Sequence, residues 1–135
     1  CAAAVSDFKP RIKSKQKIKK SKELKFLEFE KNPDILEYLG KNNKFRPKLV
    51  VGFSAETEKL IENSISKLKN KFCDLIIANN VSDKHVGFNV DYNKVSIINK
   101  EGCVEEISKN KKSFIANILA KRIVDAYLID DKNIN

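Results

Sequence analysis

Lysine is the residue type whose spacing in this chain most plainly suggests chemistry. Lys67 and Lys71 are four positions apart, so on a helix they share one face. A dense run within positions 9–22 adds further ammonium groups: Lys13, Lys15, Lys17, Lys19, Lys20 and Lys22. Clustered lysines attract phosphates and other multiply charged anions. The run alone is equally typical of a solvated loop or of a patch that binds nucleic-acid phosphates without sequence preference.

The other candidate site residues are single side chains with two interpretations each. Asp7 follows a short apolar run and could contact a nucleotide or a metal ion, or could be a turn residue. Phe53 could stack on a base or belong to the core. Asn79 and Asn80 follow a predicted buried strand and fit either a site or an ordinary turn.

Activated nucleophiles are not predicted. The one histidine, His85, lies in a polar loop without an evident partner, and Cys73 precedes an apolar strand. The chain contains no Ser–His–Asp, Cys–His, GxGxxG or Walker pattern. Positioning of a ligand and neutralisation of its charge are therefore the chemistry that these residues favour.

Composition predicts one globular domain over residues 1–135, with 41% hydrophobic residues and a net charge of +9. Three cysteines without a CxxC pair favour a reducing, cytoplasmic environment and give no zinc motif. No apolar run approaches the ~20 residues that cross a bilayer, so no membrane association is expected. The opening Cys1, without an initiator methionine, suggests a chain cut within a strand.

Apolar patterning predicts alternating strands and helices. Strands are expected at 24–29, 49–53, 74–79, 95–98 and 103–104, and helices at 56–71 and 115–128. The 56–71 helix should bury one face: Leu60, Ile61, Ser64, Ile65 and Leu68. Such alternation indicates an α/β sandwich with a mostly parallel sheet. Ligands bind beyond the carboxyl ends of such strands, where Ser6–Asp7, Gly52–Ser54 and Asn79–Asn80 are expected to end strands.

A further helix is predicted after position 31. Asn32 is suited to its N-cap, Pro33 to its first position and Asp34 to its first turn. Gly40 is expected to end it.

Six blocks of the sequence, in this order, resemble the phosphopantothenate–cysteine ligase family. They are residues 3–8, 17–20, 32–36, 51–57, 74–82 and 87–89. The lysine-rich and Asn-Pro-Asp blocks are similar to the bacterial, CTP-dependent branch. Ser54 and Asn80 depart from the Ala and Asp that are usual in the family.

The resemblance implies a three-layer, Rossmann-like sandwich in which residues 9–22 form a lysine-rich flap. It also implies a ligase that joins 4'-phosphopantothenate to cysteine. CTP would activate the substrate as an acyl-cytidylate, with Mg²⁺ as cofactor and without FMN in this chain. An amino-terminal portion with a phosphate-binding loop would be missing, so the isolated chain is expected to be inactive. A homodimer and a fused decarboxylase domain are implied for the native protein, and nucleic acid is not expected as a partner.

The resemblance also implies roles for particular residues. Lys17 would be the catalytic lysine of the flap, closing over the acyl-cytidylate. The nucleotide would be bound by twelve residues: Cys1, Ala2, Ala3, Asp7, Lys17, Pro33, Asp34, Ile35, Leu36, Phe53, Lys67 and Lys71. The metal ligands stay unassigned. The chief alternative to this ligase is a basic module that binds nucleic acid without catalysis, and the second is a regulatory or scaffolding α/β domain that has lost catalysis.

Overall fold

The computed structural model describes residues 1–17, 26–41, 44–81 and 90–132. The chain divides into two compact units. The core unit comprises Cys1–Ala2 and Leu36–Asn135, and the hairpin unit comprises Ala3–Ile35. The single domain expected over residues 1–135 stays a prediction, and each unit is described by itself.

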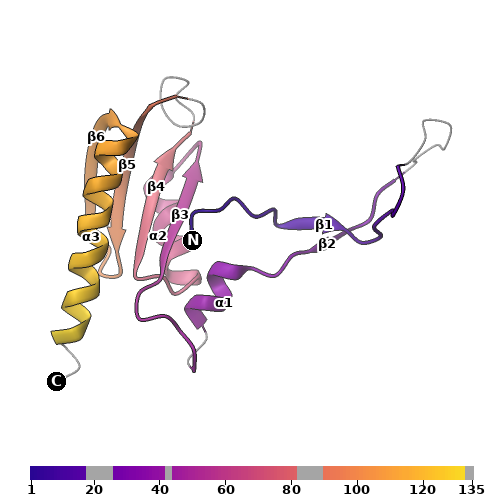
Figure 1. The fold of residues 1–135 in the computed structure, drawn as a ribbon, viewed down its shortest axis with the longest axis horizontal. Coiled ribbons are helices and arrows are strands. Elements are labelled where there is room, and N and C mark those ends of the chain that lie inside the picture. Colours follow the sequence, from indigo (N-terminus) through magenta and orange to yellow (C-terminus); the bar gives the residue numbers. More distant parts are fainter. Residues whose placement is uncertain (18–25, 42–43, 82–89, 133–135) are drawn as a thin grey trace. The chain divides into compact units, whose positions relative to one another are not determined.

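A four-stranded sheet forms the centre of the core unit (Figure 1), in the order β3-β4-β5-β6. Its strands are β3 (Val51–Glu56), β4 (Leu75–Asn80), β5 (Tyr92–Asn99) and β6 (Val104–Lys111). Its helices are α1 (Ile35–Lys41), α2 (Leu60–Asn70) and α3 (Lys112–Lys132). The predicted α/β class is confirmed.

Two apolar clusters, one on each face of the sheet, make the unit three-layered. On one face α1 and α2 contribute Leu36, Leu60, Ile61 and Ile65, which pack against buried residues including Ile76, Ala78 and Ile98. On the other face α3 contributes Ile115, Ile118, Leu119 and Ile123, which pack with Leu75, Ile77, Val95 and Ile97. Consecutive residues of β4 alternate between the clusters, because successive side chains of a strand point to opposite faces. The strand is therefore apolar at every position from Leu75 to Ala78, as its sequence predicts.

The expected parallel pairing holds for one strand pair only. β3 and β4 are parallel, in register from Val51↔Leu75 to Glu56↔Asn80, because α2 forms the crossover between them. β4 with β5, and β5 with β6, pair antiparallel. A tight turn explains the last pair: Gly102 has φ of 84° and donates its backbone N–H to the Asn99 carbonyl at 2.9 Å.

The helix expected after position 31 begins and ends later than predicted. α1 starts at Ile35 rather than at Pro33, because Asn32 has other hydrogen-bond partners. Its backbone N–H donates to the Asp7 carbonyl at 2.8 Å and its side-chain amide donates to the Ser6 carbonyl at 2.8 Å. Gly40 lies inside the helix instead of ending it, and a Cβ there would lie 1.9 Å from the Lys71 carbonyl oxygen. Glycine at this position therefore allows α1 to approach the end of α2 closely.

The α2 helix also begins later than the predicted 56–71, because residues up to Glu56 belong to β3. Its predicted apolar face is confirmed, with Ser64 and Leu68 buried and Leu60, Ile61 and Ile65 packed against the core. Within the described residues, none of the helices combines the length and the apolar composition that crossing a bilayer requires.

The hairpin unit contains the antiparallel strands β1 (Phe8–Pro10) and β2 (Phe29–Lys31). The strand predicted at 24–29 is shifted, since β2 starts at Phe29 and residues 18–25 lie outside the described part. The lysine-rich segment 9–22 begins as β1, so its first residues are paired rather than a free loop, and its role as a flap stays a prediction. Surface ion pairs join the two strands, Lys9–Glu30 at 3.2 Å and Arg11–Glu28 at 3.2 Å.

Candidate functional site

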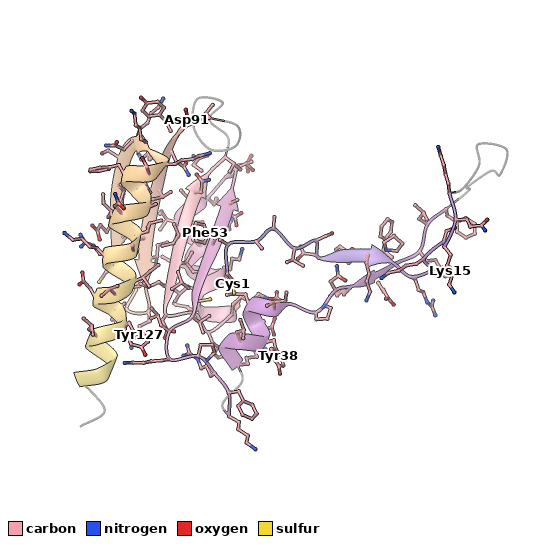
Figure 2. All side chains as sticks on the ribbon, in the orientation of Figure 1. Cys1, Lys15, Tyr38, Phe53, Asp91 and Tyr127 are labelled. Atoms are coloured by element: carbon pink, nitrogen blue, oxygen red, sulfur yellow. The ribbon has the colours of Figure 1, made fainter. Side chains whose placement is uncertain are left out.

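The outer edge of β3 collects two of the predicted site residues. The Cys1 nitrogen donates to the Val51 carbonyl at 2.7 Å, and the Lys67 Nζ donates to the Phe53 carbonyl at 2.9 Å. Val51 and Phe53 are two positions apart, so their carbonyls point the same way from the strand. Figure 2 shows Cys1 beside the strand that carries Phe53. The strand that was expected to end at Ser6–Asp7 does not form.

The Phe53 side chain is 39% exposed, so it is not the buried core aromatic that was its alternative interpretation. It shares a face of β3 with Val51, which packs against the α3-side cluster. Phe53 lies within β3 rather than at its carboxyl end, where it was predicted. A partly exposed ring at a strand edge is suited to stacking on a planar ligand.

The α2 lysines lie one helical turn apart, as their spacing predicts. Lys67 is half-buried against the β3 edge, whereas Lys71 follows the last residue of α2. The Lys71 Nζ donates to Glu37 Oε2 at 2.7 Å, and Lys41 Nζ donates to the other oxygen of the same carboxylate. These hydrogen bonds, first from Lys41 and then from Lys71, hold the pKa of Glu37 below its ordinary value.

Two close approaches position α1 beside these lysines. A Cβ on Gly52 would lie 2.8 Å from Leu36 Cδ2 and 2.7 Å from Ile76 Cδ1, so only glycine lets α1 pack this tightly on β3. Gly40 does the same at the end of α2. Arg46 reinforces this arrangement by donating to the Gly40 carbonyl at 3.0 Å and to the Phe72 carbonyl at 3.0 Å. Leu36 therefore contributes to the site region from the core side.

The core unit thus contains six of the predicted nucleotide-binding residues: Cys1, Ala2, Leu36, Phe53, Lys67 and Lys71. The others belong to the hairpin unit: Ala3, Asp7, Lys17, Pro33, Asp34 and Ile35. All six of these are exposed, and their roles stay predictions. Asp7 precedes β1 instead of ending a strand of the main sheet, which corrects its predicted position.

Magnesium ligands are not evident among the described residues of the core unit. Mg²⁺ is usually bound through one or two carboxylates together with substrate phosphates. In the described part of the chain, no group of three or more His, Cys, Asp or Glu residues could hold a metal ion. Glu37 is bonded by two lysines, and Glu56 accepts from Ser54 Oγ at 2.8 Å. These side chains do not make a metal site by themselves.

Cys73 is excluded as a nucleophile at neutral pH. Burial raises the pKa of its thiol to about 11, so the thiolate is scarce. His85 lies outside the described residues, as do the predicted block 87–89 and Lys19, Lys20 and Lys22. Cys73 is therefore not an activated nucleophile, and the described contacts of the site region supply charge and shape.

Glu37 is the site residue that sequence reasoning missed. Its spacing of four from Lys41 indicates a pair on a helix face. Its contact with Lys71, 34 positions away, depends on the packing of α1 against the end of α2.

Comparison with known families and proteins decides the membership of the chain. Residues 1–127 match the family described as "DNA/pantothenate metabolism flavoprotein C-terminal domain". The chain belongs to this family.

Individual relatives agree with this membership. The Coenzyme A biosynthesis bifunctional protein CoaBC of Borreliella burgdorferi is 43% identical over 122 residues, covering 89% of this chain and 30% of that protein. A cysteine/cysteine sulfinic acid decarboxylase from an unknown prokaryotic organism is 35% identical over 123 residues, covering 91% of this chain and 34% of that protein. The chain therefore spans about a third of the length of these curated relatives.

A solved structure supports the fold. The crystal structure of the C-terminal domain of Coenzyme A biosynthesis bifunctional protein CoaBC superposes with a TM-score of 0.67 at 28% identity. The match covers 96% of this chain and 53% of that one. The likeness agrees with the α/β class of the core unit.

Proposed function

We propose that this chain is the part of a phosphopantothenate–cysteine ligase that binds the triphosphate nucleotide, CTP. Family membership and the names of the CoaBC relatives support a role in coenzyme A biosynthesis. One observation carries the nucleotide-binding part of the proposal. The Lys67 ammonium donates to the backbone carbonyl of Phe53 at 2.9 Å, which places a positive charge at the edge of β3, on the strand that carries this partly exposed aromatic side chain.

The proposed reaction has two steps. A carboxylate oxygen of 4'-phosphopantothenate attacks the α-phosphorus of CTP, an O–P bond forms, and pyrophosphate leaves. The amine of cysteine then attacks the acyl carbon, the C–O bond to the phosphate breaks, CMP leaves and the amine loses a proton. The product is 4'-phosphopantothenoylcysteine.

Each predicted site residue of the core unit has a separate role in this proposal. Phe53 would stack on or beside the nucleotide, while Lys67 and Lys71 neutralise its phosphates. Cys1 and Ala2 would offer backbone groups next to β3, and Leu36 would line the pocket. Electrostatic stabilisation of this kind needs positioned charges rather than a nucleophile, which agrees with the raised pKa of Cys73.

The hairpin unit would supply the remaining parts. Asp7, Ala3 and the segment 33–35 would contact the nucleotide, and Lys17 would stabilise the charge that develops in the acyl-cytidylate. A flap over 9–22 would keep water from hydrolysing this anhydride. Mg²⁺ would enter with the triphosphate as its counter-ion, without an assigned protein ligand. A homodimer, a fused decarboxylase domain and a cytoplasmic location also belong to the proposal, and no FMN is assigned to this chain.

Calorimetric titration tests the nucleotide site. The complete gene product, with 4'-phosphopantothenate and Mg²⁺ present, should bind CTP in preference to ATP and GTP. Lys67→Ala should weaken CTP binding about tenfold or more, because it removes a charge-assisted contact. Lys69→Ala is the matched control, since Lys69 is exposed on the same helix, and it should bind CTP as the unmodified protein does.

Two results would contradict the proposal. One is equal binding of CTP to the Lys67→Ala and Lys69→Ala variants. The other is tight, steeply salt-dependent binding of nucleic acid without selectivity among nucleotides, which would favour the basic module.

A further inference from the structure

Glu37 on α1 connects two lysines that come from different helices. Its Oε1 accepts from Lys41, one turn later on α1, and its Oε2 accepts from Lys71 Nζ at 2.7 Å. The Glu37–Lys71 pair is partly shielded from water, with side chains 32% and 25% exposed. Lys71 is also one of the two α2 lysines of the proposed nucleotide site. The Glu37 carboxylate therefore occupies the Lys71 ammonium group, which the proposed site would need to bind a phosphate.

A carboxylate and a phosphate compete for the same donors. Both accept charge-assisted N–H hydrogen bonds from an ammonium group. Lys41 and Lys71 lower the pKa of Glu37, so the carboxyl is ionised at neutral pH. A triphosphate that approaches Lys71 is therefore repelled by the negative Glu37 carboxylate, which is already hydrogen-bonded to the Lys71 ammonium.

We propose that Glu37 sets the nucleotide affinity of this site by holding Lys71 until a phosphate replaces it. The inference rests on the proposed function and names a residue that acts through Lys71 rather than on the nucleotide itself. Glu37 is a positioning residue in this sense, and it opposes binding.

Lys41 makes the exchange possible. Removing one partner from a shielded ion pair is costly because it leaves the other charge uncompensated. Lys41 is held near Glu37 by the helix itself, at the i,i+4 spacing. When phosphate takes Lys71, the carboxylate keeps the Lys41 contact. Lys41 should therefore favour nucleotide binding indirectly, through Glu37.

The expected effects have opposite signs. Glu37→Gln keeps the shape and removes the charge, so it should tighten CTP binding by about two- to fivefold, as for a partly exposed ion pair. Lys41→Ala removes one partner of the carboxylate, so Glu37 should hold Lys71 more strongly and CTP binding should weaken by about twofold. In the Glu37→Gln background, Lys41→Ala should have no effect, since the carboxylate through which it acts is gone.

The test is a double-mutant cycle measured by calorimetric titration of CTP into the complete gene product. The cycle contains the unmodified protein, Glu37→Gln, Lys41→Ala and the double variant, with Lys71→Ala measured beside them. Glu105→Gln is the matched control. Glu105 lies on β6, at the opposite edge of the sheet, and pairs with Arg122 of α3 at 2.7 Å, so this variant should leave CTP binding unchanged. Steady-state kinetics should show the KM for CTP falling in Glu37→Gln while kcat changes less.

The outcomes separate the two proposals. If Lys71→Ala weakens binding but Glu37→Gln leaves it unchanged or weaker, the role of Glu37 is wrong and the nucleotide site survives. If Lys71→Ala has no effect, Lys71 is not part of the nucleotide site and both proposals about it fail. If Lys41→Ala weakens binding equally in both backgrounds, Lys41 contacts the nucleotide directly and the exchange is wrong. Lys41→Ala in the otherwise unmodified protein gives a second reading that does not need Glu37→Gln to fold: unchanged or tighter CTP binding there would contradict the exchange.

Discussion

The core unit and the hairpin unit are each stabilised internally by a different kind of interaction. All buried hydrophobic side chains of the described chain lie in the core unit, in two clusters that cover the two faces of one sheet. Within residues 3–17 and 26–35 of the hairpin unit, no residue is buried. Its two short strands are joined by backbone hydrogen bonds and by ion pairs exposed to water.

The difference shows where a residue's role can be argued from structure. In the core unit, packing brings Leu36, Phe53, Lys67 and Lys71 into a described arrangement with specific partners. A two-stranded hairpin alone is marginally stable in water, so its side chains have few constraints from packing. The roles of Asp7 and Lys17 are therefore predictions, whereas the side-chain ammonium groups of Lys67 and Lys71 have observed partners.

Truncation of a core side chain gives the largest expected contrast between the units. Ile76 on β4 is fully buried, so Ile76→Ala should lower the free energy of unfolding by about 2–5 kcal/mol through lost burial and a cavity. Phe29→Ala in the hairpin unit removes a larger side chain that is 59% exposed, and should change the free energy of unfolding by about 0.5 kcal/mol or less. Urea unfolding followed by circular dichroism measures both values. Similar losses for the two variants would show that the hairpin unit has a core of its own.

Thiol reactivity offers a chemical version of the same contrast. At pH 8 the thiolate fraction of Cys73, whose pKa is raised to about 11 from 9.0, should be about 100-fold below that of an ordinary thiol. The folded protein holds the Cys73 thiol proton more tightly than the unfolded chain does. The resulting stability is therefore fully present below pH 9 and is lost as the pH rises toward and through 11. Mass spectrometry of iodoacetamide-treated protein should show rapid labelling of exposed Cys103 and slow labelling of Cys73. A cysteine placed in the hairpin unit by Ser14→Cys should react as fast as Cys103. Rapid labelling of Cys73 in the folded protein would contradict its burial in the core unit.

A pair of arginine variants gives the smallest expected contrast. Arg46 donates to the Gly40 and Phe72 carbonyls and to Asp74 at 2.8 Å, and the Asp74 side chain is only 15% exposed. Arg46→Ala should therefore lower the free energy of unfolding by about 2 kcal/mol, because shielded acceptors lose their donor. Arg11→Ala breaks an exposed pair with Glu28 in the hairpin unit and should cost less than about 1 kcal/mol. Thermal unfolding of the two variants compares the losses, and equal shifts would argue against a special role for the Arg46 network.

Much of the core unit could be predicted from sequence because burial leaves a periodic pattern. The apolar run at 74–79 and the apolar face of the helix at 56–71 correspond to β4 and α2 with modest shifts at their ends. The start of α1 could not be predicted, because Asn32 suits an N-cap by type but bonds instead to the Asp7 and Ser6 carbonyls. Strand direction beyond β4 was not readable either, since it depends on the turn at Gly102 and on connections whose direction carries no apolar period.

The sequence by itself determined the α/β class, the lysine pair on α2 and the charge that favours an anionic ligand, because residue type and helical spacing are local properties. The tertiary structure decided which groups these lysines meet: the Phe53 carbonyl for Lys67 and the Glu37 carboxylate for Lys71. These contacts join positions 14 and 34 residues apart, and the second depends on Gly40 and Gly52, which let α1 pack closely against the end of α2 and against β3. The close packing of α1 on β3 and on the end of α2 depends on how three separate elements are arranged, and no local sequence pattern predicts that arrangement.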